Sequence, residues 1–390
     1  MSFYDNRYYY INKTFLSLIG QWPFQSRLEG NVMLATTLFF ICSLTAFELL
    51  SLIEGITNPS VFMQNTSQLL MDSLIFAKLV NSIYNKYKMK DLLEHIEQTW
   101  KTTQIGPENE ILRSHAEQSR TLTIQYAFII YFMGLFYSTM PLVVKRIHSL
   151  LPTNGTYETR FLYNLEHILD VDKYFNLLML HGIISIFLLL SVGIATDSMF
   201  ILCIQHVSAL FEIVRYNLKC IRDSDIVMLK PDIADDEAYH IIIRCIKSYK
   251  RALNYSELLS STYAVCNFFL IGNVIISLSI SATEATMVKN QLDELIQMIA
   301  ANTGQLTHIF ALSLISQRLI DRSSRLHEAV YSCNWYEISL RSRQLLRFTL
   351  MRTLKPCEIK VGKIHVMSLA NFSAILQVSM SYFTMLSSLQ

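Results

Sequence analysis

The stretch "LLMLHGIISIFLLLSVGIATDSMFILCI", residues 177–204, contains a single Asp and no Glu, Lys or Arg. A run of about 20 apolar residues is long enough to cross the hydrocarbon core of a membrane as a helix. The composition of the 390-residue chain agrees, since 52% of its residues are hydrophobic and only 16% are charged, against about 25% charged in an ordinary soluble domain. The stretch therefore predicts a membrane protein built of helices.

Six further apolar runs of similar length accompany this stretch. The seven predicted spans are Val32–Ile53, Ser67–Ile83, Leu122–Val144, Leu177–Ile204, Leu259–Ala282, Gln291–Ser316 and Val361–Leu386. The pattern of a cleaved signal peptide does not precede the first run, so we expect that run to be a true span. The predicted fold class is an all-α polytopic membrane protein with seven transmembrane helices.

The Lys and Arg residues are distributed unequally between the two sides of these spans. Of the 33 Lys and Arg, 26 fall on the side of the N-terminus and five on the other, while Lys78 and Lys363 lie within predicted spans. Cytoplasmic loops carry an excess of Lys and Arg, so we expect a cytoplasmic N-terminus and an extracellular C-terminus. This orientation is the reverse of that of a G-protein-coupled receptor, and it places the glycosylation sequon at Asn154 outside the cell.

The cytoplasmic segments are long and carry apolar residues at helical spacing. The helices predicted there cover Met89–Trp100, Ile204–Ile221, Glu237–Leu258 and Leu340–Leu354. Pro356 is expected to open the next helix. Charged helices with an apolar stripe suggest that they pack together below the membrane as a cytoplasmic helical domain, although amphipathic helices lying on the lipid surface would show the same pattern.

Four short motifs mark the last quarter of the chain. They are "SQRLID" at 316–321, "AVYSCNWY" at 329–336, "KP" at 355–356 and "SYFT" at 381–384. With these motifs, its orientation and its loop proportions, the chain resembles the insect odorant receptor family. The resemblance implies a ligand-gated, non-selective cation channel in which four subunits surround one pore. Residues 1–316 would hold spans one to six and the ligand pocket, and residues 317–390 the cytoplasmic anchor helices and the pore-lining seventh helix.

The resemblance also bears on partners. The co-receptor shared within the family has a longer fourth segment and a different ending, so this chain is more similar to an odour-tuning subunit. That implies a hetero-tetramer with odorant co-receptor subunits in the plasma membrane of olfactory neuron dendrites, in contact with lipid, permeating cations and a small volatile odorant. Tyr331, Trp335 and Tyr336 would belong to the anchor between subunits. Two alternatives remain, a gustatory-type receptor forming its own tetramer and a membrane transporter, although we find no paired broken helices of the kind transporters often show.

One face of the last predicted span carries small or flexible residues. Ala374, Val378, Ser381, Met385 and Ser388 recur at steps of four, three, four and three, which is helical spacing. A narrow pore needs an uncharged wall with some hydroxyls and an apolar constriction. By resemblance, Met385 matches the hydrophobic gate, where a smaller aliphatic is more usual, and Ser388 matches a polar position just outside it, where Gln is common. The alternative is that this face packs on a neighbouring helix.

The resemblance further implies a ligand pocket in the outer halves of spans two, three, four and six. The residues predicted to line it are Ser73, Phe76, Tyr131, Gly134, Leu135, Ser138, Leu177, His181, Ile184, Ser185, Ile296, Ala300 and Thr303. Because most of them are apolar and none is Asp, Glu, Lys or Arg, apolar burial would drive binding and a charged ligand would lack a partner. We therefore expect a small neutral volatile, such as an alcohol, ester, ketone or aromatic. Asp72 would admit an amine if it borders the pocket.

The sequence contains no pattern typical of an enzyme. A glycine-rich phosphate loop, a His-Glu-x-x-His pattern and a Cys-x-x-Cys pair are all missing, so we expect no catalysis, no cofactor, no metal and no nucleic-acid partner. The ionisable residues that fall in predicted spans include Glu48, Asp72, Lys78 and Asp197. Such residues are functional candidates by default, but snorkelling to the membrane surface, or pairing with a neighbouring helix, would also explain them.

Overall fold

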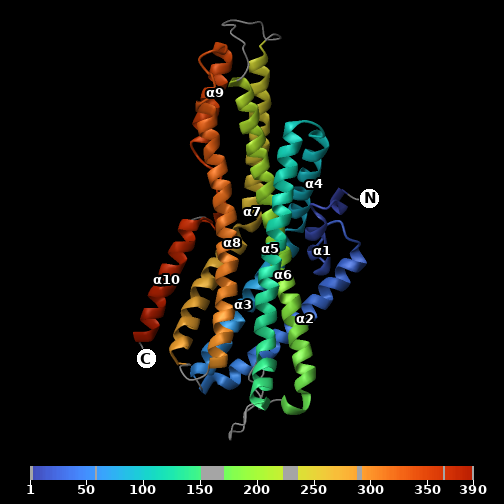
Figure 1. The fold of residues 1–390 in the computed structure, drawn as a ribbon, viewed down its shortest axis with the longest axis vertical. Coiled ribbons are helices and arrows are strands. Elements are labelled where there is room, and N and C mark those ends of the chain that lie inside the picture. The colour runs from blue at the N-terminus through green and yellow to red at the C-terminus, as the bar shows by residue number, and fades with distance from the viewer. Residues whose placement is uncertain are drawn as a thin grey trace.

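The chain folds into an elongated bundle of helices (Figure 1). The computed structural model describes residues 3–57, 59–150, 171–222, 236–287, 292–362 and 365–388. The elements in chain order are the 3-10 helix η1 (Phe3–Asp5), α1 (Tyr10–Leu18), α2 (Arg27–Glu54), the 3-10 helix η2 (Gly55–Thr57), α3 (Pro59–Tyr84), α4 (Lys86–Thr102), α5 (Pro107–Leu150), α6 (Val171–Arg222), α7 (Glu237–Met287), α8 (Leu292–Tyr331), α9 (Leu340–Thr353), β1 (Lys360–Val361), β2 (His365–Val366) and α10 (Leu369–Ser388).

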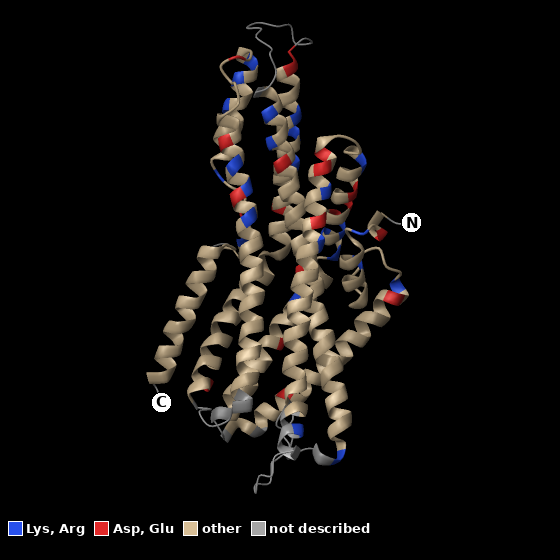
Figure 2. Cartoon of the chain, viewed as in Figure 1, with Lys and Arg blue, Asp and Glu red and all other residues tan. Residues whose placement is uncertain are grey.

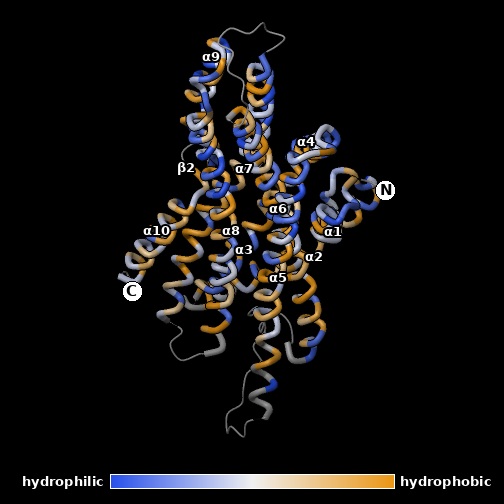
Figure 3. Tube along the Cα trace, turned by 45° about the horizontal axis from the view of Figure 1, so that its top comes forward, coloured by the Kyte–Doolittle hydropathy of each residue, from blue (hydrophilic) through white to orange (hydrophobic). Residues whose placement is uncertain are grey.

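The bundle divides into an apolar half and a charged half. Figure 2 shows most of the Lys, Arg, Asp and Glu residues in the upper half of the view, around α4, α9 and the adjoining ends of α5 to α8. The lower half is largely free of charge, and its helices are mostly hydrophobic (Figure 3). Because unpaired charges are excluded from hydrocarbon, the lower half is the part suited to a membrane.

Six of the described helices are long and apolar enough to cross a membrane: α2, α5, α6, α7, α8 and α10. The remaining predicted span, Ser67–Ile83, lies in α3, which is not among the six. The 26 residues of α3 would reach about 39 Å at 1.5 Å per residue, so its length is sufficient. Its mean hydropathy is too low, because it carries several Gln, Asn and Ser residues as well as Asp72 and Lys78, and both of these charged residues are buried in the bundle. Helix α3 therefore turns its polar side chains to its neighbours, and it packs along α7, α2 and α6.

Helices are found where the sequence predicted them outside the spans, as α4, the ends of α6 and α7, and α9. In α4 the apolar stripe is fully covered by the rest of the chain, since Leu92 and Ile96 have no exposed surface. The start of α7 at Glu237 has a local cause: the backbone N–H of Tyr239 donates to Asp236 Oδ1 at 2.9 Å, which satisfies a free N–H of the first turn. These helices pack together instead of lying separately on a lipid surface.

The start of the last helix differs from the prediction. Helix α10 begins at Leu369, and Pro356 opens an extended segment instead of a helix. This segment forms a two-stranded antiparallel hairpin in which Lys360 pairs with Val366. Gly362 adopts a φ of 60°, which glycine tolerates because it has no Cβ, and its N–H donates to Ala264 O of α7 at 2.9 Å. The hairpin is therefore fastened to α7, and α10 is shorter than the predicted span.

The N-terminal segment was not predicted to be structured, yet it packs against the bundle. Helix α1 lies on α6, where Asn12 Nδ2 donates to Ser198 O at 3.0 Å. The segment also buries Tyr4 and Tyr9, whose rings pack against Trp22 and Trp100 respectively, in edge-to-face contacts. Such contacts close the bundle at the border between its two halves.

Candidate functional site

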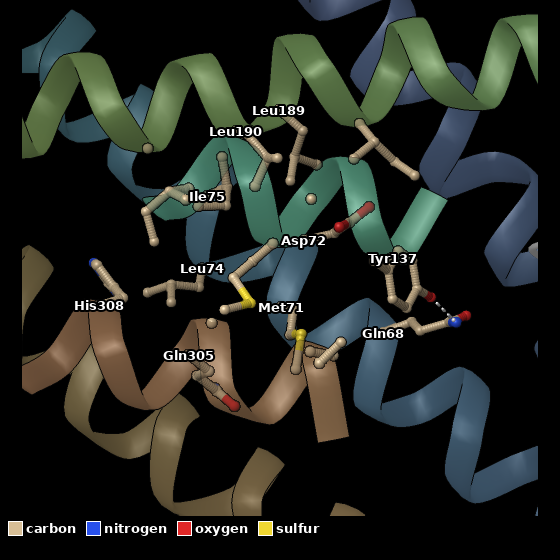
Figure 4. A pocket seen from close by; sticks show the side chains of 18 of the residues that line it. Gln68, Met71, Asp72, Leu74, Ile75, Tyr137, Leu189, Leu190, Gln305 and His308 are labelled. Carbon is tan, nitrogen blue, oxygen red and sulfur yellow. Dashed lines mark hydrogen bonds between the residues drawn. The ribbon is translucent and has the colours of Figure 1, made fainter. Parts of the chain in front are cut away.

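A cavity of about 220 Å³ lies inside the apolar half of the bundle. Its wall comes from α2, α3, α5, α6, α7 and α8, and much of it is aliphatic, with Leu74, Ile75, Leu189 and Leu190 among the lining residues (Figure 4). This volume is below the roughly 300–1,000 Å³ of sites for drug-sized ligands. The cavity therefore has room for a small, mainly apolar molecule.

One end of the cavity is closed by a buried ion pair. Lys78 Nζ of α3 donates to Asp197 Oδ1 of α6 at 2.5 Å, and the two side chains are only 4% and 5% exposed. Lys78 Nζ is also 2.6 Å from His308 Nε2 of α8, and the Tyr126 hydroxyl of α5 donates to Asp197 Oδ2 at 2.6 Å. Four helices are thus held together by one charged network, so that pairing with a neighbouring helix, rather than snorkelling, accounts for both Lys78 and Asp197.

The other end of the cavity is acidic and polar. Figure 4 shows Asp72 between His308 at one end and Gln68 with Tyr137 at the other, where Gln68 Nε2 donates to the Tyr137 hydroxyl at 2.7 Å. The carboxyl groups of Asp72 and Glu48 lie close to each other, and both are buried.

Two of the thirteen predicted ligand residues, Gly134 and Ala300, line this cavity. Three of the others contact neighbouring helices. The hydroxyl of Tyr131 lies 2.8 Å from Ser191 Oγ. Ser73 Oγ accepts from Asn273 Nδ2 at 2.8 Å. His181 Nε2 is 2.9 Å from Ser43 Oγ. The polar groups expected to orient a ligand here bind other protein groups.

The remaining predicted ligand residues also lie outside the cavity wall. Those exposed on the surface of the bundle are Phe76, Leu135, Leu177, Ile184 and Thr303. Those covered or partly covered by other helices are Ser138, Ser185 and Ile296. In the apolar half of the bundle, an exposed Phe or Leu faces the position that lipid would occupy.

The difference is mainly one of helix rotation. In α5 the lining residues are Tyr126, Ile130, Met133, Gly134 and Tyr137, whereas the predicted residues were Tyr131, Gly134, Leu135 and Ser138. A shift of one residue rotates the chosen face of a helix by about 100°. The predicted face of α5 is therefore turned by about one residue from the face that lines this cavity.

The ionisable residues of the predicted spans indicated the cavity wall better than apolar spacing did. Glu48, Asp72 and Asp197 all line the cavity, together with Glu284 of α7. Asp72 was noted at the sequence level as a residue that would change the ligand class if it bordered the pocket, and it does line the cavity. Because polar groups in a membrane helix turn away from lipid, these positions mark the inward face more directly than apolar spacing does.

Helix α10 lies at the side of the bundle, against α7 and α8 (Figure 1). Its inward face includes Ile375 and Ser379, and Ser279 Oγ of α7 donates to Ser379 O at 3.1 Å. Ser381, Met385 and Ser388, the predicted pore residues, are exposed. Of the six candidate spans α10 is the least buried, so the predicted pore face is free for a contact outside this chain.

The predicted anchor residues are exposed as well. Tyr331 lies at the end of α8, and Trp335 and Tyr336 follow it. The ring centroids of Trp335 and Tyr336 are 5.9 Å apart. Phe348 and Met351 of α9 add further exposed apolar surface at this end of the bundle. The predicted glycosylation site, Asn154, lies outside the described residues.

Comparison with known proteins gives matches over most of the chain. The model of the 7tm odorant receptor family matches residues 58–380. Odorant receptor 9a of Drosophila melanogaster is 21% identical over 352 residues, which cover 86% of this chain and 83% of that protein. The odorant receptor coreceptor of Aedes aegypti is 24% identical over 141 residues, covering 36% of this chain and 30% of that one.

A solved structure shares the fold. The insect olfactory receptor OR5 from Machilis hrabei, in complex with eugenol, superposes with a TM-score of 0.75 and covers 98% of this chain and 97% of its own. The two sequences are 13% identical, so the similarity is one of fold.

Proposed function

We propose, from the premise that this chain belongs to the 7tm odorant receptor family of insects, that it is the odour-tuning subunit of a ligand-gated, non-selective cation channel. The observation that carries the proposal is the cavity enclosed by the apolar half of the bundle beside Gly134 and Ala300. A small volatile with an apolar body would gain free energy there by leaving water, at about 25 cal/mol per Å² of buried apolar surface. The OR5 receptor of Machilis hrabei, which has this fold, was solved with the small molecule eugenol.

The pore of the proposed channel is lined by α10 of each subunit. This is supported by the exposed face of α10, where Met385 is 53% exposed in a single chain. In four subunits arranged around one axis, Met385 would form the hydrophobic constriction, with Ser381 and Ser388 on either side of it. Residues 1–316 then act as the ligand-binding unit, and residues 317–390 act as the anchor and pore unit.

Co-receptor subunits complete the proposed tetramer. Two observations support this: odorant receptor coreceptors are among the relatives of this chain, and the anchor residues Tyr331, Trp335 and Tyr336 leave exposed aromatic surface. Aromatic residues are enriched at protein interfaces. The complex would lie in the plasma membrane of olfactory neurons, with the charged half of each bundle in the cytoplasm, an orientation that the distribution of Lys and Arg supports.

Co-expression tests this function. Cells that produce this chain together with an odorant co-receptor are expected to pass robust inward current when exposed to a panel of volatiles, whereas the chain alone gives little, because the pore needs both kinds of subunit. Cells with the co-receptor alone are the control. Full currents from this chain alone would favour a gustatory-type receptor that forms its own tetramer. A chain that reaches the surface and gives no current with any volatile, with or without the co-receptor, would contradict the channel.

The pore face has its own test. Met385→Cys and Ser388→Cys are expected to react with a membrane-impermeant thiol reagent applied outside the cell, and the reaction should change the odour-evoked current. Met380→Cys is the matched control, because Met380 is 56% exposed but lies about 120° around the helix from the pore face. Phe383→Cys, on the packed face, should not react. Equal insensitivity of Cys at positions 385, 388 and 380 would mean that the face of Met385 is not in a water-filled path.

A further inference from the structure

The cavity wall is rich in acidic groups. Among the described residues that line it are the four carboxyl groups of Glu48, Asp72, Asp197 and Glu284, and none is Lys or Arg. Lys78, next to the cavity, pairs with Asp197. The other three carboxyl groups have no Lys or Arg partner among the described residues. The cavity therefore presents more acidic than basic groups to whatever it encloses.

Two of these carboxyl groups have unused oxygen atoms. Asp72 Oδ2 and Glu48 Oε2 are buried and accept no hydrogen bond from a described residue. Asp72 is 8% exposed and Glu48 is 4% exposed. A buried acceptor left unsatisfied is costly, and such atoms usually have a partner. A hydrogen-bond donor that entered the cavity would satisfy both of these oxygen atoms.

The chemistry of the donor distinguishes ligand classes. An ester or ketone has no polar hydrogen to donate, and an alcohol has one. A protonated primary amine has three donors and brings the positive charge that acidic groups in an apolar site lack. The expectation of a neutral ligand depended on a predicted set without Asp, Glu, Lys or Arg, and most of that set lies away from this cavity. Glu48, Asp72 and Glu284, which do line the cavity, favour a ligand that carries a positive charge over a neutral one.

We propose that the cavity binds a small primary amine, with its ammonium group against the Asp72–Glu48 pair and its hydrocarbon body against Ile75, Leu189 and Leu190. This rests on the proposed function, since it names the class of ligand for the same cavity. A metal ion fits less well, because the described residues contain no group of three or more His, Cys, Asp or Glu side chains that could hold one. The aliphatic part of the wall would not stabilise a bare ion, but it would pack against the hydrocarbon body of an amine.

The test compares two molecules of the same shape. Hexylamine carries an alkylammonium group like that of lysine, whose pKa of about 10.4 keeps it charged at pH 7, and hexanol replaces that group with a hydroxyl. The purified full-length chain in detergent is titrated with each, and binding is followed through the rise in its thermal unfolding temperature. Hexylamine is expected to bind at least about tenfold more tightly than hexanol, which corresponds to about 1.4 kcal/mol. Equal or tighter binding of hexanol would overturn the inference.

Variants locate the binding group. Asp72→Asn keeps the size of the side chain but removes its charge, and it should weaken hexylamine binding about tenfold while hexanol binding changes little. Glu257→Gln, at an exposed position of α7 outside the cavity, is the matched control and should bind hexylamine as the unchanged chain does. An Asp72→Asn chain that still binds hexanol is folded, so unchanged hexylamine binding in it would also overturn the inference. If Asp72→Asn fails to fold, the comparison of hexylamine with hexanol on the unchanged chain decides whether the cavity prefers an amine.

The result is separable from that of the proposed function. Currents evoked by hexanol but not by hexylamine in cells with the co-receptor would leave the odorant-gated channel in place and remove the amine. Tight hexylamine binding to a chain that gives no current with any compound would establish the site and remove the channel.

Discussion

Replacing Lys78 with Met will prevent most molecules of the protein from folding, because it leaves the Asp197 carboxylate buried without the Lys78 cation. Removing one partner of a buried ion pair costs about 3–5 kcal/mol, a large part of the roughly 5–15 kcal/mol that stabilises a typical domain. The loss is expected to be large here because Lys78 and Asp197 are 4% and 5% exposed. The measurement is the amount of chain at the cell surface, together with the unfolding temperature of what can be purified.

Two further variants show whether the pair itself is responsible. Lys78→Met combined with Asp197→Asn removes both charges and should recover a substantial part of the surface level, since the two residues interact directly and their effects are not additive. Lys90→Met is the matched control, because Lys90 pairs with Glu94 at 3.5 Å with both side chains nearly half exposed, and such pairs contribute less than about 1 kcal/mol. A Lys78→Met chain as abundant as Lys90→Met would refute the role given to the buried pair.

Replacing Gly134 with Leu will abolish or strongly weaken odour responses while the chain still reaches the surface. A Cβ added at Gly134 would lie 2.1 Å from Leu190 Cδ1, so even the first carbon displaces the end of a side chain that lines the cavity. The additional carbons of Leu would fill the space. If accommodating a ligand beside the added side chain costs as much as overpacking a core, about 1–3 kcal/mol, potency falls by about 5- to 150-fold, with Gly134→Ala intermediate. Concentration–response curves of the odour-evoked current measure it.

Other glycines provide the controls for this prediction. A Cβ at Gly304, which also lines the cavity, meets its nearest atom, Met133 Cβ, at 3.9 Å, and a Cβ at Gly272 meets nothing within 4 Å. Gly304→Ala should therefore change the response only slightly, and Gly272→Leu should leave it unaltered. An unchanged odour response in a Gly134→Leu chain would mean that ligands bind elsewhere.

The positions of the long helices could be predicted because burial in a membrane imposes long apolar runs, as in residues 177–204. The rotation of each helix could not, because a helix that faces lipid on one side and apolar neighbours on the other is apolar all round. Tyr131 was predicted at the pocket, but its ring stacks on Phe187 of α6 with centroids 5.1 Å apart. The polar positions carried the missing information: Asp72 and Asp197 each identify the inward face of their helix.

The shorter elements, the hairpin and α1, could not be predicted from their local sequence. The hairpin at Lys360–Val366 could not be read from its sequence because its strands have only two residues each, and its stability depends on bonds to α7. One of them is the bond from the Lys360 N–H to Ser260 Oγ at 3.0 Å. Helix α1 likewise depends on α6, a partner far away in the chain. Elements held by distant contacts leave little trace in local spacing.

The attachment of α10 has a mechanical consequence. The segment before it is joined to α7 by the hairpin, and its middle rests on α7, where Ser279 Oγ donates to Ser379 O. Its first turn also contacts α8, where the Leu369 N–H donates to Gln317 Oε1 and the ring of Phe372 packs on Phe310. Helix α7 also lines the cavity, at Ser281, two residues after Ser279. A molecule that displaced α7 at Ser281 would therefore also move the part of α7 on which the middle of α10 rests, and with it the helix that carries Met385 and Ser388.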